Sequence, residues 1–344
     1  MATVSLPPLR VGLIGCGGIA GNHLAGYRLV EEADLVACCD IAPEKAREFA
    51  ARAGISDACS DYREFLARGD IDMVDICAID EVHAEIAVAA LKAGKHALIE
   101  KPFAMSVAEG EEIISAARES GCRAMCAQSL RWHPRWRAIK QAIDSGRIGT
   151  PVYARYSGPS SPFWRPEQID AYRDRPPEWL LIHNGMHSFD LMTWLLGSLP
   201  VRVHARSHPG QEWLPVHEYV SCVTRFASGA IAHTEENRIM PPPRYPLGNE
   251  IYLVGTAGTI DATDRLTHFG DITAADGYSL LAPGSSYALT DPDMPFACEI
   301  REFARAVLAD EEVPIPLETS LGVLKAVLAG AESLRTGEAV SIDA

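Results

Sequence analysis

The sequence contains no apolar run long enough to cross a membrane and no pattern typical of a secretory leader. Its longest apolar runs, such as residues 191–196, fall far short of the roughly 20 residues that a membrane-spanning helix needs. The opening residues, Met-Ala-Thr-Val-Ser-Leu-Pro-Pro, provide neither a basic segment nor an apolar core. We therefore expect a cytoplasmic protein without a membrane partner.

Positive charge is also scarce. The chain has 31 Lys and Arg residues against 46 Asp and Glu residues, which gives a formal net charge of −15. This charge would repel the phosphates of nucleic acids and of anionic membranes. The acidic excess is spread along the chain and does not form an interaction tail, so we expect no nucleic-acid partner.

A disulfide framework is not expected, because the nine cysteines are an odd number in a long chain and many of them lie in apolar runs. Thiols in such runs behave as small hydrophobic side chains. Cys122 and Cys126 alone are spaced closely enough to suggest a metal pair, but they lack a second pair of ligands. We therefore predict no metal site.

The first half of the chain alternates short apolar strands with amphipathic helices. Such alternation predicts βαβ units and a parallel sheet that is buried on both faces. Gly94 and Gly121 follow two of the helices, as left-handed C-caps do. The expected strands are 11–15, 35–40, 73–78, 96–100 and 123–128, and the expected helices are 19–30, 43–53, 82–93 and 107–120.

The pattern changes near Pro134, where strands begin to dominate. Residues 227–229, Ala-Ser-Gly, fit a three-residue hairpin, which favours an antiparallel sheet. We predict an α/β protein with two domains. A doubly wound parallel sheet occupies 1–130, and an α+β domain with a largely antiparallel, open sheet occupies 131–344, with the closing helices able to pack back on the first domain. The expected elements are helices 136–145, 180–196, 296–308 and 319–336, strands 152–157, 201–207, 219–226, 230–238 and 250–255, and an irregular stretch at 158–179.

A glycine-rich turn follows the first predicted strand and matches G-x-G-x-x-A from Gly15 to Ala20. Gly15 would permit the tight turn, Gly17 would let the backbone approach a pyrophosphate, and Ala20 would allow close packing of helix on strand. The helix that opens near Gly18 and Ile19 would offer its N–H groups to phosphates. The motif predicts a Rossmann domain that binds a dinucleotide.

Asp40 stands at the end of the second predicted strand, twenty residues after Ala20. A carboxylate there would accept hydrogen bonds from the adenosine ribose and would repel a 2′-phosphate, so NAD is favoured over NADP. The other predicted cofactor residues are Ile41, Ala78, Ile79, His83, Glu100, Lys101 and Gln128.

A longer motif, A-L-x-A-G-K-H-x-x-x-E-K-P, runs from Ala90 to Pro102. With it the chain closely resembles the glucose-fructose oxidoreductase / inositol dehydrogenase (Gfo/Idh/MocA) family over nearly its whole length. The resemblance implies hydride transfer between NAD and a carbon of a sugar, cyclitol or related polyol. Further matches are Asp61-Tyr62, Ile148-Gly149, residues 255–259 and residues 333–337.

The resemblance also implies catalytic residues. The lysine of E-K-P carries over to Lys101, which would hold the reacting hydroxyl. The family's D-x-G-x-H-x-x-D block reads here from His183 to Asp190, so His187 matches the catalytic histidine and would act as general base. His183 replaces the usual aspartate, and we assign it as a third catalytic candidate that contacts a substrate hydroxyl. Family members commonly associate through the sheet of the second domain, so we expect a homodimer or homotetramer, with Val220, Val223 and Ile231 on the shared face.

Several alternatives stay open. His183 and His187 have a zinc spacing, but Asn184 replaces the glutamate of the metalloprotease form, and the pair could instead be buried core histidines. A glycosidase that retains its NAD and a non-catalytic NAD-binding regulator are alternative functions, the second disfavoured because a sensor needs no proton acceptor. Candidates for the substrate rim, or for a plain surface loop, are Trp164, Arg165, Tyr172, Arg173 and Trp179.

Overall fold

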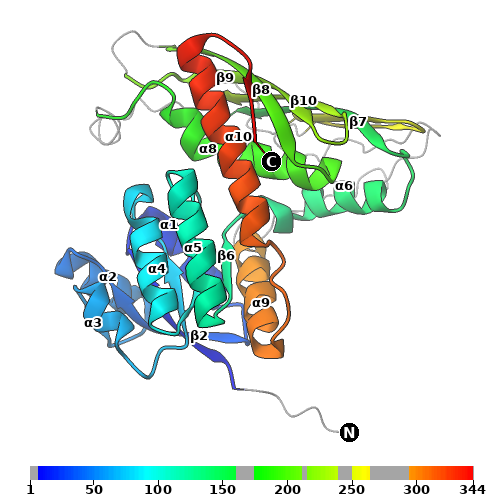
Figure 1. The fold of residues 1–344 in the computed structure, drawn as a ribbon. Helices are drawn as coiled ribbons and strands as arrows, with labels where there is room; N and C mark the ends of the chain where they lie inside the picture. Colours follow the sequence, from blue (N-terminus) through cyan, green and yellow to red (C-terminus); the bar gives the residue numbers. More distant parts are fainter. Residues whose placement is uncertain (1–6, 160–173, 211–214, 239–249, 264–293, 344) are drawn as a thin grey trace, which may run out of the picture. The chain divides into compact units, whose positions relative to one another are not determined.

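The first half of the chain forms a six-stranded parallel sheet whose strands alternate with helices (Figure 1). The strand order β3-β2-β1-β4-β5-β6 is that of a doubly wound sheet, with a reversal of direction beside β1. The strands are β1 (Leu9–Ile14), β2 (Ala33–Cys39), β3 (Ala58–Cys59), β4 (Met73–Ile76), β5 (His96–Ile99) and β6 (Ala124–Cys126). The helices are α1 (Gly18–Tyr27), α2 (Pro43–Ala53), α3 (Tyr62–Leu66), α4 (His83–Lys92) and α5 (Val107–Ser120), with short 3-10 turns η1 (Asp80–Val82) and η2 (Ser129–Trp132).

This computed structural model describes residues 7–159, 174–210, 215–238, 250–263 and 294–343. The chain divides into two compact units, Met1–His133 with Asp291–Leu321, and Pro134–Thr290 with Gly322–Ala344. The first unit therefore includes α9 (Met294–Ala309), which packs on α1 where Gly26 leaves room for Ile300 and Ala297. Within the described residues, no helix is long and apolar enough to span a bilayer.

Local sequence signals explain where the helices of the first unit begin and end. Ser106 and Glu109 form a capping box at the start of α5, and Gly121 at φ 71° ends that helix in the left-handed conformation. Gly54 at φ 75° ends α2 in the same way. The predicted bounds of α2 and α5 are confirmed at both ends. The prediction missed β3 and α3, which with two and five residues are too short for a periodic pattern.

The second unit is built on a seven-stranded sheet in the order β12-β11-β7-β10-β9-β8-β13. β7 and β10 pair in parallel and all other neighbours are antiparallel, so the predicted α+β class is confirmed. Gly229 at φ 90° closes the predicted hairpin between β9 and β10. The elements are α6 (Pro134–Asp144), β7 (Pro151–Pro159), α8 (Trp179–Leu196), β8 (Pro200–His208), β9 (Tyr219–Phe226), β10 (Ile231–Asn237), β11 (Glu250–Gly255), β12 (Thr259–Thr263), α10 (Leu317–Thr336) and β13 (Val340–Ser341).

One face of this second sheet is covered by helices and the other carries exposed side chains. α8 packs on β7, β9 and β10, and the later part of α10 packs on β8 through Gly330 and Ser333 (Figure 1). Val223 and Ile231 are exposed, as predicted. The prediction for Val220 is wrong, because side chains alternate along a strand and Val220 points to the helix-covered face, where it is 1% exposed.

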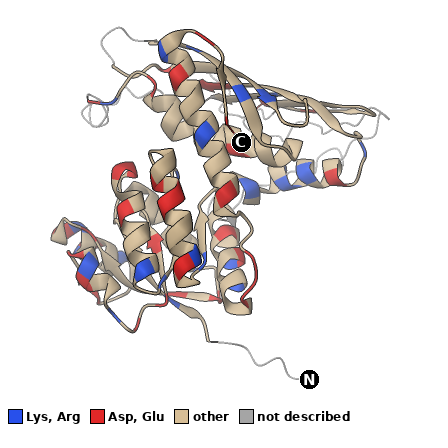
Figure 2. Cartoon of the chain, viewed as in Figure 1, with Lys and Arg blue, Asp and Glu red and all other residues tan. Residues whose placement is uncertain are grey.

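Charged residues of both signs are interspersed over the helices of the first unit rather than separated into patches (Figure 2). This agrees with an acidic excess that is distributed along the sequence.

Candidate cofactor and catalytic site

The glycine turn between β1 and α1 is fixed by close backbone contacts. Gly15 has φ 95°, and a Cβ there would lie 2.5 Å from the backbone nitrogen of Ala78. Its N–H donates to the carbonyl of Cys39 at 2.8 Å. The turn is thereby held between the ends of β2 and β4, and only glycine fits at this position.

The next two glycines leave open space at the beginning of α1. A Cβ on Gly17 or Gly18 would meet nothing within 4 Å, and no side chain caps the helix. Ala20 is fully buried against the apolar core, which fixes the helix on the sheet, while Ile19 is partly buried beside it. The first N–H groups of α1 thus face space into which a pyrophosphate fits.

Asp40 holds this turn in place. One carboxylate oxygen accepts the N–H of Cys16 at 2.8 Å, and the other accepts the N–H of Ala42 at 2.9 Å. Each oxygen has a second lone pair, so the carboxylate can also accept a bond from a ligand hydroxyl. Two large apolar side chains stand in solvent at the same carboxyl edge of the sheet, Ile41 after β2 (92% exposed) and Ile79 after β4 (63% exposed).

His83 serves the fold rather than offering a free imidazole. It is 1% exposed, with Nδ1 2.8 Å from the carbonyl oxygen of Pro102 and Nε2 3.0 Å from that of Ala78. The side chain therefore joins the loop after β4 to the loop after β5. These contacts fix the imidazole beside Ala78, and the predicted cofactor role of His83 stays a prediction.

Gln128 at the end of β6 is completely buried, and its main-chain N–H donates to Glu299 Oε1 at 2.5 Å. The amide nitrogen and oxygen of its side chain have no hydrogen-bond partner among the described residues. A buried amide that lacks partners is costly, and a polar ligand at this edge would satisfy it. The open glycines and this amide fit a dinucleotide that carries its own amide.

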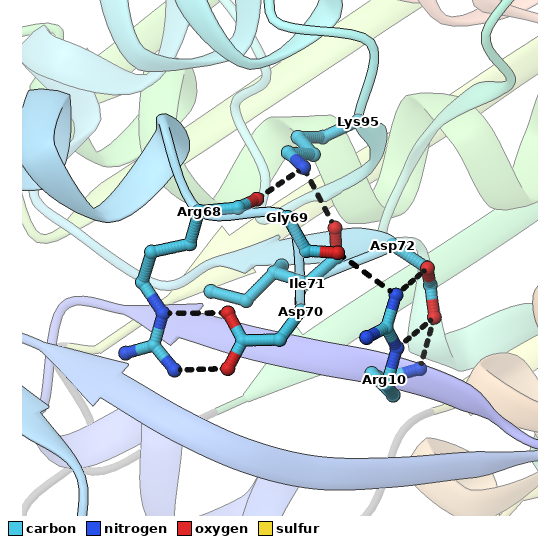
Figure 3. Close-up of polar contacts among 7 residues, drawn as sticks. All are labelled: Arg10, Arg68, Gly69, Asp70, Ile71, Asp72 and Lys95. Atoms are coloured by element: carbon cyan, nitrogen blue, oxygen red, sulfur yellow. Dashed lines mark hydrogen bonds and ion pairs between the residues drawn. The ribbon is translucent and has the colours of Figure 1, made fainter.

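Two lysines of the long motif have different environments. Lys95, at the amino end of β5, is 9% exposed and donates to the carbonyls of Arg68 and Ile71 at 2.6 and 2.8 Å (Figure 3). The same close-up shows Arg10 bound to Asp72 at the start of β1, so this edge is structural. Lys101 follows the carboxyl end of β5 and is partly exposed, and its main-chain N–H donates to Glu100 Oε2 at 3.0 Å.

The histidines of α8 lie on its accessible side. His183 and His187 are both partly exposed on a helix where thirteen of eighteen residues are buried, which argues against two core histidines. The ring of Trp179 stacks on His183 with centroids 4.6 Å apart. Trp179 is itself 5% exposed, so its prediction as a rim residue is wrong. Trp164, Arg165, Tyr172 and Arg173 lie outside the described residues.

The comparison with known proteins now identifies the chain. Residues 9–128 match the oxidoreductase family with an NAD-binding Rossmann fold, and residues 136–261 match the GFO/IDH/MocA C-terminal domain. The chain belongs to the GFO/IDH/MocA family. This family member is therefore an NAD-binding oxidoreductase, and the predicted recognition, enzyme class and cofactor are confirmed.

Relatives of this GFO/IDH/MocA protein include a 1,5-anhydro-D-fructose reductase of Ensifer adhaerens, 28% identical over 342 residues, with 97% of this chain and 98% of the relative covered. A myo-inositol 2-dehydrogenase of Thermotoga maritima is 24% identical over 74% of this chain and 75% of the relative. The WlbA dehydrogenase of Bordetella pertussis, solved with NADH and UDP-GlcNAcA, shares the fold with a TM-score of 0.83, 22% identity and 99% coverage of both chains.

Proposed function

We propose that this protein catalyses NAD-dependent oxidation or reduction at a hydroxyl-bearing carbon of a sugar, cyclitol or related polyol. The main support for this proposal is the position of Lys101. This partly exposed lysine lies on the loop after β5, at the same carboxyl edge of the sheet as the glycine turn. Ligands of doubly wound sheets bind at this edge. The relatives named above, which include a reductase of an anhydro sugar and an inositol dehydrogenase, support the substrate class.

In the proposed reaction, bound NAD supplies the acceptor for the hydride that leaves the substrate carbon. The ammonium of Lys101 holds the reacting oxygen and favours loss of its proton. His187 accepts this proton as general base, for which a neutral imidazole is suited near pH 7. His183, which replaces an aspartate of the family pattern, orients a neighbouring hydroxyl. A two-electron oxidation to a carbonyl is balanced by one hydride and one proton.

The test is formation of NADH with a panel of free sugars, inositols and other polyols. We expect one chemical class to reduce NAD⁺ stoichiometrically. Turnover of glycosides without net NADH would instead support a glycosidase that retains its cofactor. Binding of NAD with no turnover of either class would contradict the proposed activity.

We also propose that the protein is a homodimer or homotetramer joined through the open face of the second sheet. Three large apolar side chains of this face are between 40% and 48% exposed: Val223 on β9, Ile231 on the neighbouring β10, and Tyr252 on β11, which β7 separates from β10. Polar pairs lie further along β9 and β10: Ser221 with His233 at 2.8 Å and Tyr219 with Glu235 at 2.9 Å. Exposed apolar side chains beside polar pairs are typical of a protein interface.

A further inference from the structure

Buried charged side chains connect helix α1 to the backbone of Lys101. His23 on α1 is fully buried, with Nδ1 2.7 Å from Asp75 Oδ2 and Nε2 3.1 Å from Glu100 Oε1. The other oxygen of Glu100 accepts the main-chain N–H of Lys101 at 3.0 Å. Both ring nitrogens of His23 and both oxygens of Glu100 thus have specific partners, and all four residues belong to the first unit.

The geometry fits a charged imidazole. Two ionised carboxylates can only accept hydrogen bonds, and an imidazolium has a proton on each nitrogen to donate to both. Burial alone would lower the pKa of His23, but the negative charge of Asp75 and its hydrogen bond raise that pKa well above the ordinary value. His23 is then an imidazolium between two carboxylates, an arrangement that fixes the position of all three groups.

A metal ion does not explain this cluster. His23, Asp75 and Cys77 bring together one nitrogen, one oxygen and one sulfur donor, as a zinc site would. Two tetrahedral ligands about 2 Å from one zinc ion lie roughly 3.3 Å apart. The 2.7 Å between Nδ1 and Oδ2 is instead the distance of a charged hydrogen bond.

We propose that His23 is a positioning residue of the active site, which orients the Glu100 carboxylate and through it the backbone from which Lys101 extends. This inference rests on the proposed function, in which Lys101 contacts the substrate oxygen. α1 begins at the glycine turn, so the helix that would hold a bound pyrophosphate at its beginning also contacts, through His23, the carboxylate that binds the Lys101 backbone. Misplacement of a reacting group by about 1 Å costs on the order of 10²-fold in rate. Hydrogen bonds that hold the backbone of Lys101 in place therefore contribute to the reaction rate.

The neighbours of this link support its role and supply a control. From α9, the ring of Phe296 packs on His23 with centroids 5.2 Å apart. Burial and the charge of Glu100 raise the pKa of Glu299, also on α9, well above its ordinary value, which favours the neutral form of this group beside the cluster. Tyr27 donates to Asp75 Oδ2 at 2.9 Å, the same oxygen that His23 contacts, and has no hydrogen bond to Glu100 among those of the described residues.

The direct test is hydrogen exchange of the Lys101 amide in the NAD⁺ complex, read by mass spectrometry with residue-level fragmentation. His23→Gln cannot provide a cation to both carboxylates, and we expect the Lys101 amide to exchange about tenfold faster. Tyr27→Phe is the matched control, because Tyr27 is also buried and bonded to the same aspartate, and it should change this exchange less than about twofold. Unchanged exchange in His23→Gln, or an equal increase in Tyr27→Phe, would overturn the proposal.

The kinetic test uses the substrate found in the polyol screen. His23→Gln should lower kcat by about 10- to 100-fold and leave the Kd of NAD⁺ nearly unchanged. The double variant with Glu100→Gln should lose no more than the larger single loss, because both act through one link. Should His23→Gln not fold, Glu100→Gln alone must show faster Lys101 exchange and lower kcat, or the proposal fails. If Lys101→Ala retains full turnover, the proposed function fails, whereas amide exchange still decides whether His23 holds Lys101.

Discussion

At the scale of single residues, Asp40 shows how one carboxylate serves both fold and selectivity. It binds the N–H groups of Cys16 and Ala42, so its charge is fixed at the carboxyl end of β2. A 2′-phosphate beside this charge would be repelled. We expect Asp40→Ser to narrow the preference for NAD over NADP by about tenfold or more, as measured by fluorescence titration of NADH and NADPH. Equal affinities in the unmodified protein would show that Asp40 does not read the ribose.

Lys95 and Lys92 form a matched pair of lysines near the start of β5. Lys95 donates to two backbone carbonyls from a buried position, while the side chain of Lys92 is 64% exposed. Lys95→Met leaves both carbonyls without their charged donor and should lower the free energy of unfolding by about 2–4 kcal/mol in urea denaturation. Lys92→Met should change it by less than about 0.5 kcal/mol. NAD affinity should be the same in both variants, since the amino edge of the sheet, where these lysines lie, is opposite the glycine turn.

The raised pKa of Glu299 leads to a prediction about how stability depends on pH. Its pKa is raised by burial and by Glu100, so the folded state binds this proton more tightly than the unfolded state does. Unfolding therefore releases a proton, and the contribution of Glu299 to stability falls as pH rises above the unfolded pKa of about 4.3, by at most about 1.4 kcal/mol per pH unit. Glu299→Gln keeps an oxygen for the Gln128 N–H and removes this dependence. Urea midpoints from pH 5 to pH 8 should fall less steeply in the variant, and parallel curves would contradict the assignment.

At the scale of elements, the catalytic prediction concerns two histidines of helix α8. Most of its residues are buried, and His183 and His187 one turn apart remain partly exposed. His187→Ala should lower kcat by on the order of 10²–10⁴ with little change in NAD affinity, because the substrate proton then has no acceptor. His183→Ala should show a smaller loss, mainly in KM, if it orients the substrate. Near-normal turnover of His187→Ala on the identified substrate would refute the mechanism.

Elements with strong local signals could be predicted from the sequence. The ends of α2 and α5 were predicted, and those of β9 and β10 within one residue. The structure shows glycine caps, a capping box and a hairpin glycine at these ends. β12 and β13 could not be found, because their pairing with β11 and β8 is set by contacts far along the chain. Val220 was assigned to the wrong face because alternation gives two faces without saying which one the helices cover.

Residues of the candidate site could be predicted where they belong to a sequence motif. They could not be predicted where their role depends on contacts that form only in the folded chain. Gly15 and Asp40 were found from their spacing, and the structure adds the contacts that require them. His23 was missed, because a single histidine on a helix does not by itself indicate a function. Its partners Asp75 and Glu100 are 52 and 77 residues away in the sequence, and only the folded sheet brings them to it. The contacts of His83 with two carbonyls could not be predicted either, because only the folded chain brings Ala78 and Pro102 to it.

At the scale of the whole molecule, the exposed face of the second sheet leads to the last prediction. Val223 and Ile231 expose apolar surface from the hairpin strands β9 and β10, flanked by Arg225 on the same face. A folded monomer gains nothing from such a patch, whereas a second copy would bury it. We expect light scattering at micromolar concentration to give a dimer or tetramer.

The interface variant is Val223→Glu combined with Ile231→Glu, which would place like charges against each other across a self-complementary face. These substitutions should shift the protein toward monomer while leaving its far-ultraviolet circular dichroism unchanged. The control is Leu199→Glu, an exposed leucine on the turn before β8 (43% exposed), which should not change the mass in solution. A monomeric parent protein would contradict the predicted assembly. A double variant that keeps the mass of an oligomeric parent would place the association on a different surface.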